Sequence, residues 1–436
     1  MSAILIKGGR LIDPAAGIDA ERDLLLRDNR VLAVDAPGKL KAAAKQEEAE
    51  TIDASGFVVA PGLVDIHVHL REPGQGYKET IASGTAAAAA GGFTSVCAMP
   101  NTTPVNDSLE ITRWMQSPDR GARIHVFPIV AATRGSQGEA LTEYGSLKSA
   151  GAVAVTDDGK PILSDAIMHQ ALAAAARAGL PVIQHAEDTR MTGGCSMNAG
   201  PVAFRLGLRG MPTEAESSLV ERDIRLLADL KDSRAHLHVA HLSTAAALEA
   251  VRRARRNGLR VTCEVAPHHF LLTDEAVANY DTNAKMNPPL RSQADRDAML
   301  AGILEGTVDC IATDHAPHAA HEKEQEFERA PNGITGLETA LGLSLSLLHK
   351  HHKLSVSRVI GLLSSQPANV LGLKGRGTLS VGAYADVVIF DPAATWTFRA
   401  AGSKSKGKNT PFDGWSMVGK VHMTISEGRI AFRAQG

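Results

Sequence analysis

The chain has 436 residues, more than one ordinary domain uses, so its length predicts a large domain with a smaller accessory one. Apolar residues make up 44% of the chain, enough for a sizeable core, and the formal net charge is only -2. This balance gives no electrostatic reason to expect a nucleic acid or an anionic membrane as a partner.

The first 60 residues are expected to be β-structure. Short apolar runs at 4–6, 24–26 and 31–34 are separated by turn residues. The start has neither the charged leader nor the apolar run of a signal peptide, and no stretch reaches about 18 uninterrupted apolar residues. We therefore expect a cytoplasmic protein without a membrane segment.

Between residues 61 and 372 the pattern changes to strands alternating with helices. Eight apolar runs predict strands at 63–68, 93–98, 124–130, 152–155, 181–184, 236–240, 260–265 and 308–312. Helical patterns separate most of them, at 79–91, 107–116, 164–179, 213–230, 243–257 and 293–305, with a last one at 334–350. Eight such units predict an α/β fold of the (β/α)₈ TIM-barrel type. A doubly wound sheet would need a glycine-rich phosphate turn after its first strand, where this sequence has none.

The C-terminal part returns to β-structure, with apolar runs at 385–391 and 421–426. We expect residues 1–60 and 373–436 to form one discontinuous β-sandwich that a catalytic barrel of residues 61–372 interrupts. Two connecting segments are expected to be loops: 191–212, which is rich in glycine, and 401–409, whose Lys, Ser and Gly residues predict exposure to solvent.

The four cysteines have no close pair among them. Cys97, Cys263 and Cys310 lie in apolar strand-like runs, and Cys195 lies in a loop. This distribution favours small buried apolar side chains in a reducing compartment over disulfides or a thiolate metal site.

Two histidines end the first barrel strand. His67 and His69 are two residues apart, so they project from the same face of an extended strand, and Arg71 continues that register. Such a pair can chelate a metal ion, although the spacing alone is common in sites that bind none.

Other candidate ligands fall at the ends of further strands. Asp157 and Asp158 end the fourth strand, and His185, His241 and Asp314 end the fifth, sixth and eighth. Barrel active sites form where the carboxyl ends of the strands meet. Four histidines and two carboxylates at that face predict a two-metal hydrolytic site, and ligands of this kind suit Zn²⁺, with Mn²⁺ or Co²⁺ as substitutes.

Several motifs resemble those of the dihydroorotases, the bacterial class I type in particular. They occupy residues 65–74, 99–102, 184–188, 286–291, 313–318 and 333–339. The resemblance covers essentially the whole chain, and the motifs together are typical of the amidohydrolase superfamily of cyclic amide hydrolases. The segments with Arg71, Asn101 and Asn287 favour the dihydroorotases within it.

The resemblance implies a metal set and a catalytic group. His67, His69 and Asp314 would hold one Zn²⁺, His185 and His241 a second and weaker one, and Asp158 would bridge the two. A hydroxide activated by the metals would be the nucleophile. Asp314 would act as general acid and base.

The resemblance also implies the residues that bind substrate. Arg71, Asn101 and His318 would hold a substrate carboxylate, for which a guanidinium offers a bidentate fork. Asn287 and backbone amides near Pro331 and Gly333 would contact the amide edges of the ring.

The implied reaction is the reversible interconversion of L-dihydroorotate and N-carbamoyl-L-aspartate in pyrimidine biosynthesis. The implied partners are this small-molecule substrate, a second copy of the chain in a homodimer, and an aspartate transcarbamoylase subunit. Hydantoinase or allantoinase activity is one alternative, but those substrates give Arg71 no carboxylate to bind. A non-catalytic scaffold for the transcarbamoylase is another, although such a subunit could lose metal ligands and this chain has all six.

Some assignments stay open. Many relatives bridge their metals with a carboxylated lysine. In this chain the candidates for the bridging group are Asp158, Asp157 and a carboxylated Lys160. An acidic residue expected near 197–200 is absent, with Ala199 in that segment. Residues 319–332, with their charged run at 321–329, are either a lid over the site or a solvated helix.

The remaining histidines of the barrel are given no metal. His268 and His269 are expected to have hydrogen-bonded structural roles, and His236 and His238 are expected to pack within the sixth strand or to support the ligands.

Overall fold

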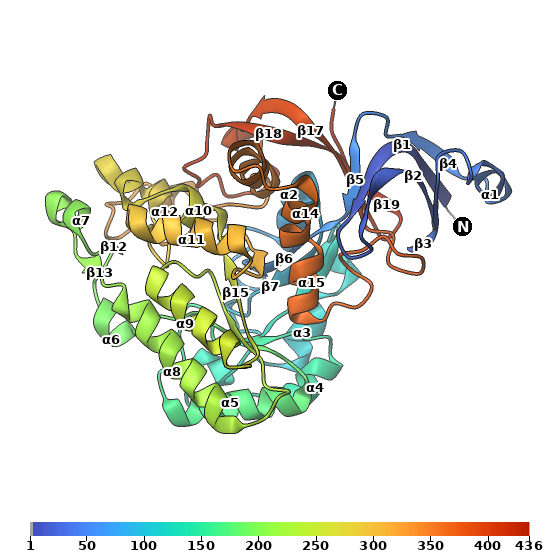
Figure 1. Ribbon diagram of the computed structural model, residues 1–436. Helices are drawn as coiled ribbons and strands as arrows, with labels where there is room; N and C mark the ends of the chain where they lie inside the picture. The colour runs from blue at the N-terminus through green and yellow to red at the C-terminus, as the bar shows by residue number, and fades with distance from the viewer. Residues whose placement is uncertain (1–2, 436) are drawn as a thin grey trace.

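The computed structural model describes residues 3–435, and strands from both ends of the chain form one sheet (Figure 1). Its order is β19 (Arg429–Arg433), β18 (Ser416–Ser426), β17 (Val387–Thr397), β5 (Val58–Pro61), β1 (Ala3–Asp13), β2 (Ile18–Arg27) and β3 (Arg30–Asp35), and β4 (Glu50–Asp53) pairs with β1. Strands of the N-terminal and C-terminal segments therefore pair with one another in a single sheet.

Apolar side chains explain why this sheet holds together. Ile6 and Leu24 on paired strands β1 and β2 pack in one buried cluster with Ile389 on β17 and Ile425 on β18. The short helix α1 (Lys41–Gln46) was not expected within the β-rich first 60 residues.

All eight strands expected between residues 61 and 372 are present. In chain order they are β6 (Leu63–Val68), β7 (Phe93–Ala98), β8 (His125–Pro128) continued by β9 (Val130–Ala131), β10 (Val155–Thr156), β11 (Val182–Gln184), β14 (Leu237–Val239), β15 (Val261–Val265) and β16 (Cys310–Ile311). Successive strands pair in parallel, as β6-β7-β8 and as β9-β10-β11-β14-β15-β16. An isolated parallel bridge joins Val68, at the end of β6, to His315, which follows β16.

Six expected helices lie between these strands. They are α2 (Ile81–Ala90), α3 (Leu109–Met115), α5 (Asp165–Ala178), α8 (Glu214–Leu230), α9 (Ala245–Arg256) and α11 (Gln293–Glu305). Five of them start at a Ser or Thr whose side chain accepts a backbone N–H of the first turn, namely Thr80, Ser108, Ser164, Thr244 and Ser292. Buried faces such as Met168 and Leu172 of α5 join the main apolar core.

Two expectations need correction. The helix expected at 334–350 begins only with α13 (Ala340–Ser344) and continues as a π-helix over Leu345–His351, because residues 334–336 instead bond to segments beside the site. The segment 191–212 contains short elements rather than a plain loop: β12 (Met197–Asn198) pairs with β13 (Gly210–Met211), and α7 (Pro201–Leu206) lies between them.

The segment 401–409 is also not simply exposed. Ser405, Gly407 and Asn409 are buried, because the chain between β17 and β18 turns back onto the segment that follows β16. Composition predicted the exposed lysines of this segment but not its alternating buried positions.

The helices α4 (Tyr144–Ser149), α14 (Val356–Leu363) and α15 (Ser365–Leu371) were not expected. The last of them ends at Gly372, whose φ of 66° is left-handed, at the expected end of the central segment. Cys97, Cys263 and Cys310 are buried and all four cysteines are free thiols, as expected. Within residues 3–435, the helices are all too short or too polar to cross a bilayer.

Candidate metal and substrate site

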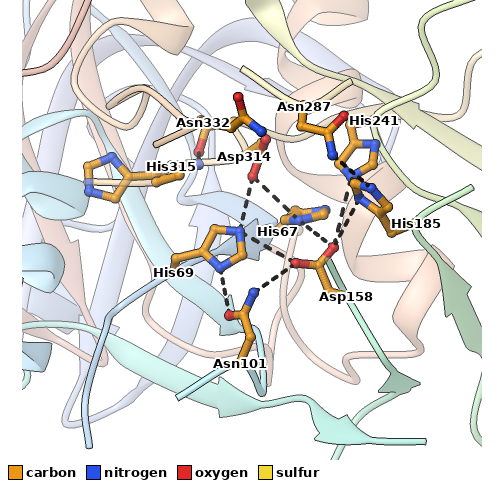
Figure 2. A network of polar contacts seen from close by, with 12 residues as sticks. His67, His69, Asn101, Asp158, His185, His241, Asn287, Asp314, His315 and Asn332 are labelled. Atoms are coloured by element: carbon orange, nitrogen blue, oxygen red, sulfur yellow. Dashed lines mark hydrogen bonds and ion pairs between the residues drawn. The ribbon is translucent and has the colours of Figure 1, made fainter. Parts of the chain in front are cut away.

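The six predicted metal ligands converge at the carboxyl ends of the central parallel strands, around the carboxylate of Asp158 (Figure 2). Its Oδ1 lies 3.5 Å from Nε2 of His67, 3.7 Å from Nδ1 of His185 and 3.9 Å from Nε2 of His241. Its Oδ2 lies 3.7 Å from Nε2 of His69. Each of the four imidazoles therefore presents a nitrogen to one carboxylate.

Asp314 faces this cluster from the segment after β16. Its Oδ1 lies 3.1 Å from Nε2 of His69 and 3.5 Å from Nε2 of His67. Burial would raise the pKa of the Asp314 carboxyl, but the hydrogen bond from His69 and the charge of His67 hold that pKa below its ordinary range. The carboxylate is therefore ionised and can accept a proton.

The donor atoms form two overlapping groups that could each hold a metal ion. One consists of His67, His69 and Asp158, and the other of Asp158, His185 and His241, with the donor atoms of each group within 4.8 Å of one another. Asp158 belongs to both groups. The geometry thus offers two adjacent cation sites that share one carboxylate.

Unpartnered atoms support the fit of a cation. Nε2 of His67 and Oδ1 of Asp158 are buried and have no hydrogen-bond partner within residues 3–435. Burial would raise the pKa of Asp158, but His67 and the neighbouring imidazoles hold it well below its ordinary value. Leaving such atoms buried without a partner is costly, and a cation at this point would satisfy both.

The structure separates Asp158 from its neighbours in sequence. Asp157 accepts a hydrogen bond from the backbone N–H of Thr133 at 3.0 Å and another from its hydroxyl, which directs it away from the imidazoles. The side chain of Lys160 is exposed. Of the three alternatives for a bridging group, the structure brings only Asp158 into the cluster.

Three residues of the site have left-handed backbones. The φ angles of Arg71, His241 and Asp314 are 63°, 29° and 49°. Non-glycine residues rarely adopt this conformation, which costs about 1–3 kcal/mol and occurs mostly at functional sites. The turn at each strand end directs these side chains into one cavity.

Two further carboxylates orient the imidazoles, and the sequence analysis did not assign them. Oε1 of Glu264 accepts Nδ1–H of His67 at 2.7 Å, and its Oε2 lies 3.1 Å from Nε2 of His238. Burial would raise the pKa of Glu264, but His67 and His238 lower it to about 2, so the carboxylate stays ionised. The sequence feature that could have indicated this role is the charge of Glu264 within the otherwise apolar run of β15. The expected supporting role of His238 fits this contact.

Glu187 orients the other half of the site. Its Oε2 lies 3.0 Å from Nε2 of His185 and accepts Nδ2–H of Asn287 at 2.7 Å. Glu187 stands within a motif of the sequence analysis that gave it no role. Its carboxylate connects a metal-ligand candidate to a substrate-binding candidate.

A cavity of about 210 Å³ opens onto the cluster. It is lined by His69, Arg71, Asn101, Asp158, Gly159, His185, His241, Asn287, Asp314, Ala316, Asn332 and Gly333. Asn101 bonds Nδ1 of His69 at 2.9 Å and donates to Oδ2 of Asp158 at 3.1 Å. It therefore fixes two ligand candidates while facing the cavity.

Arg71 lies in the cavity wall as an unpaired cation. Its Nε donates to the carbonyl of Pro317 at 3.2 Å, and a terminal nitrogen lies 3.4 Å from Nε2 of His318. Within residues 3–435 no carboxylate lies within 4.0 Å of its guanidinium. Burial lowers the pKa of Arg71, with Asp314 and Asp158 acting in the opposite direction. Beside Arg71, burial and the guanidinium lower the pKa of His318 to about 3, so His318 is neutral.

Pro331 and Gly333, near which backbone contacts to the substrate are expected, are held by bonds within the protein. Gly333 lines the cavity, but its N–H donates to the carbonyl of Lys285 at 3.0 Å. Pro331 has no N–H, and its carbonyl accepts from Nζ of Lys323 at 2.8 Å. These bonds fix the loop, so neither residue offers a free N–H to a substrate.

Three of the four histidines expected to be structural have hydrogen bonds, whereas Nε2 of His268 is buried without a partner within residues 3–435. Nε2 of His269 donates to the carbonyl of Pro288 at 3.0 Å, and His236 bonds the hydroxyl of Thr262. The charged segment after β16 begins with α12 (Ala320–Lys323) and buries Phe327. It is therefore packed onto the molecule rather than fully solvated.

Comparisons with known proteins agree on the family. Residues 56–247 match the Dihydro-orotase-like family and residues 328–432 match the Amidohydrolase family. A dihydroorotase of Citrifermentans bemidjiense is 50% identical over 432 residues, which are 99% of this chain and 100% of that protein. One from Syntrophus aciditrophicus is 47% identical over 99% of both chains.

Solved structures agree on the fold. The L-hydantoinase (dihydropyrimidinase) of Arthrobacter aurescens has a TM-score of 0.86 at 24% identity, over 99% of this chain and 96% of that one. A dihydropyrimidinase from Brevibacillus agri has a TM-score of 0.83 at 23% identity, over 99% and 95%. At 23–24% identity, the likeness to these solved structures shows the fold alone. The dihydroorotases, in contrast, are about 50% identical over nearly the full length, which shows the family. The chain belongs to the dihydroorotase family of the amidohydrolases.

Proposed function

We propose that this protein catalyses the reversible hydrolysis of L-dihydroorotate to N-carbamoyl-L-aspartate. The observation that carries the proposal is Arg71, a cation in the wall of the cavity at the histidine cluster, with no carboxylate partner among residues 3–435. A guanidinium can bind the ring carboxylate of dihydroorotate bidentately. Hydantoin and allantoin have no such carboxylate.

We propose a Zn²⁺ pair at the cluster, since its imidazole and carboxylate donors suit that ion. One ion would be held by His67, His69 and Asp314, and the other by His185 and His241. Asp158 would bind both ions, and its membership of both donor groups supports this bridging role. When bound, the metals would lower the pKa of water and polarise the scissile carbonyl.

Asp314 is the proposed proton carrier. During ring opening the amide C–N bond breaks, the oxygen of water joins the carbonyl carbon, and a proton must reach the ring nitrogen. The ionised Oδ1 of Asp314, beside His69 and His67, can take the proton of water and return it to that nitrogen. Ring closure uses the same group in reverse.

The other residues of the cavity would orient the substrate. Arg71 and Asn101 would hold the carboxylate. His318 would support Arg71 from the side, since its neutral ring donates Nε2–H to the carbonyl of Asn332 at 2.8 Å. Asn287, fixed by Glu187, would contact the amide edge of the ring. Gly333, whose N–H and carbonyl both have partners within the protein, would line the wall without bonding the substrate.

We also propose that the parallel strands close into a (β/α)₈ barrel of residues 61–372. The bridge between Val68 and His315 joins the two ends of the strand path, and one buried cluster includes Ile66 of β6, Ile183 of β11 and Cys310 of β16. Residues 1–60 and 373–436 would form the second domain, with its sheet folded as a sandwich around its own apolar cluster. A cytoplasmic homodimer and an aspartate transcarbamoylase partner rest on the family resemblance.

The test is a parallel assay of the purified, zinc-loaded protein with dihydroorotate, hydantoin and allantoin. We expect kcat/KM for dihydroorotate to exceed the other two by at least 100-fold, a difference of about 2.7 kcal/mol or more. Turnover of hydantoin or allantoin at a comparable rate would contradict the carboxylate argument.

A further inference from the structure

The segment between β17 and β18 reaches from the terminal sheet to the wall of the cavity. Gly407 approaches Pro317 so closely that a Cβ at this glycine would lie 2.6 Å from Cβ of Pro317. Two residues further, Asn409 is only 4% exposed. The segment therefore packs directly against the stretch that follows β16.

Asn409 uses its whole side-chain amide in this contact. Its Oδ1 accepts the backbone N–H of His318 at 2.9 Å. Its Nδ2 donates to the carbonyl of Ala316 at 3.1 Å and to the carbonyl of Gly333 at 3.0 Å. One side chain thus joins the stretch after β16 to the stretch before α13.

The two joined stretches form part of the wall of the cavity that the histidine cluster also lines. Ala316 and Gly333 line the cavity, and Arg71 donates to the carbonyl of Pro317 between Ala316 and His318. The carbonyl of Asn409 also accepts the N–H of Thr335 at 2.8 Å. The position of the guanidinium and of His318 therefore depends on the bonds of Asn409.

We propose that Asn409 is a positioning residue for the carboxylate pocket, so that the C-terminal segment completes the catalytic site. The inference rests on the proposed function and adds a residue from outside the central segment. Asn409 contacts the wall and none of the six metal-ligand candidates, so its loss should affect substrate binding and leave metal binding unchanged.

The first test is kinetic. Asn409→Ala should raise KM for dihydroorotate at least tenfold, change kcat less than threefold and keep the zinc content of the wild type. Lys404→Ala is the matched control, since this exposed side chain lies in the same segment and only its backbone N–H bonds Glu338. Equal KM values in the wild type and Asn409→Ala would overturn the proposal.

A double-mutant cycle distinguishes positioning from general destabilisation. If Asn409 acts through Arg71, Asn409→Ala should raise KM much less in an Arg71→Lys background than in the wild type, because the bidentate contact is already lost. Effects on KM that multiply independently would show that Asn409 does not act through Arg71.

A third measurement does not need turnover. Amide hydrogen exchange at His318 should be faster in Asn409→Ala and unchanged in Lys404→Ala, because Asn409 accepts that N–H directly. If the wild type fails to hydrolyse dihydroorotate while this exchange effect is present, the proposed function fails and the positioning contact stands. Unchanged exchange at His318 would overturn the positioning role whatever the substrate.

Discussion

Arg71 and Asp158 show how single residues decide the chemistry of this site. Both are charged groups whose partners are incomplete within the described chain: the guanidinium has only a carbonyl and a neutral imidazole, and Oδ1 of Asp158 has no hydrogen bond. A charge without full partners is costly when it is buried, as Asp158 is, and less so for the half-buried Arg71. We propose a carboxylate as the ligand of Arg71 and a cation as the ligand of Asp158.

The substitution Arg71→Lys tests the first of these. Lysine keeps the positive charge and loses the bidentate geometry, so kcat/KM for dihydroorotate should fall. The fall should correspond to a loss of roughly 2–4 kcal/mol of transition-state stabilisation. Zinc content should not change, because Arg71 is not a ligand candidate. An unchanged kcat/KM would show that Arg71 does not bind the ring carboxylate.

The bridging role of Asp158 is tested by reconstituting the metal-free protein. Because an aspartate needs no chemical modification, zinc should bind equally well with and without bicarbonate. Asp158→Ala should weaken the second zinc, since two dications then lose the carboxylate between them. Asp157→Ala and Lys160→Ala are the matched controls and should keep both ions. A bicarbonate requirement that Lys160→Ala abolishes would contradict the assignment.

Glu264 should affect the metal without touching it. Carboxylates that orient a ligating histidine typically contribute about 10–100-fold to metal affinity, so Glu264→Gln should weaken zinc binding by a factor in that range. Glu216→Gln is the control, because this equally buried carboxylate binds Ser243 and Thr244 instead of an imidazole. Equal zinc affinity in Glu264→Gln and the wild type, measured by competition with a chelator, would remove this role.

At the scale of elements, periodicity was sufficient to predict the strands of residues 61–372 and most of the helices between them. Alternating apolar runs and capping residues such as Thr80 and Ser292 are local signals, and the structure confirms the elements they predict. The placement of the candidate metal ligands at the ends of the strands followed from the same pattern. Glu264 had a local signal that was not used, a charge within an apolar strand. Asn409 had none, since its burial depends on contacts with residues about 75 and 90 positions earlier in the chain.

Two buried lysines, Lys323 at the end of α12 and Lys285, bind carbonyls of the loop after α12 and make its stability dependent on pH. Nζ of Lys323 donates to the carbonyls of Pro331 and Gly333, and Nζ of Lys285 to those of Phe327 and Ala330. Within residues 3–435 neither ammonium has a carboxylate within 4.0 Å. Burial, and next the charge of Lys285, lower the pKa of Lys323 to about 7.

This pKa predicts how stability depends on pH. The ordinary pKa of lysine is 10.5, so between about pH 7 and 10.5 the unfolded chain binds more protons at Lys323 than the folded one. The free energy of unfolding should therefore rise with pH in this window by up to about 1.4 kcal/mol per pH unit from this group. Lys323→Met should lower the slope of the unfolding free energy against pH by that amount. Lys374→Met, at an exposed side chain, should leave the slope unchanged. Parallel stability curves from denaturant titrations at pH 7 to 10 would contradict the shifted pKa.

For the whole molecule, we propose that the two ends of the chain contribute to the site as well as to the terminal sheet. The segment between β17 and β18 carries Asn409, and the central strands carry the histidine cluster that lines the same cavity. The sequence predicted that the two ends meet, because both are β-rich. It did not predict that one of them returns to the site, because that contact depends on how the two units pack.

The central claim is that this family member opens an amide ring with a metal pair held at Asp158. The most direct measurement is a zinc titration of chelator-stripped protein, with bound zinc and the rate of dihydroorotate hydrolysis recorded on the same samples. The account predicts no activity without metal, two zinc equivalents per chain at saturation with the second bound more weakly, and a rate that reaches its maximum only as the second site fills. Full activity in the stripped protein, or saturation of both rate and binding at one equivalent, would contradict it.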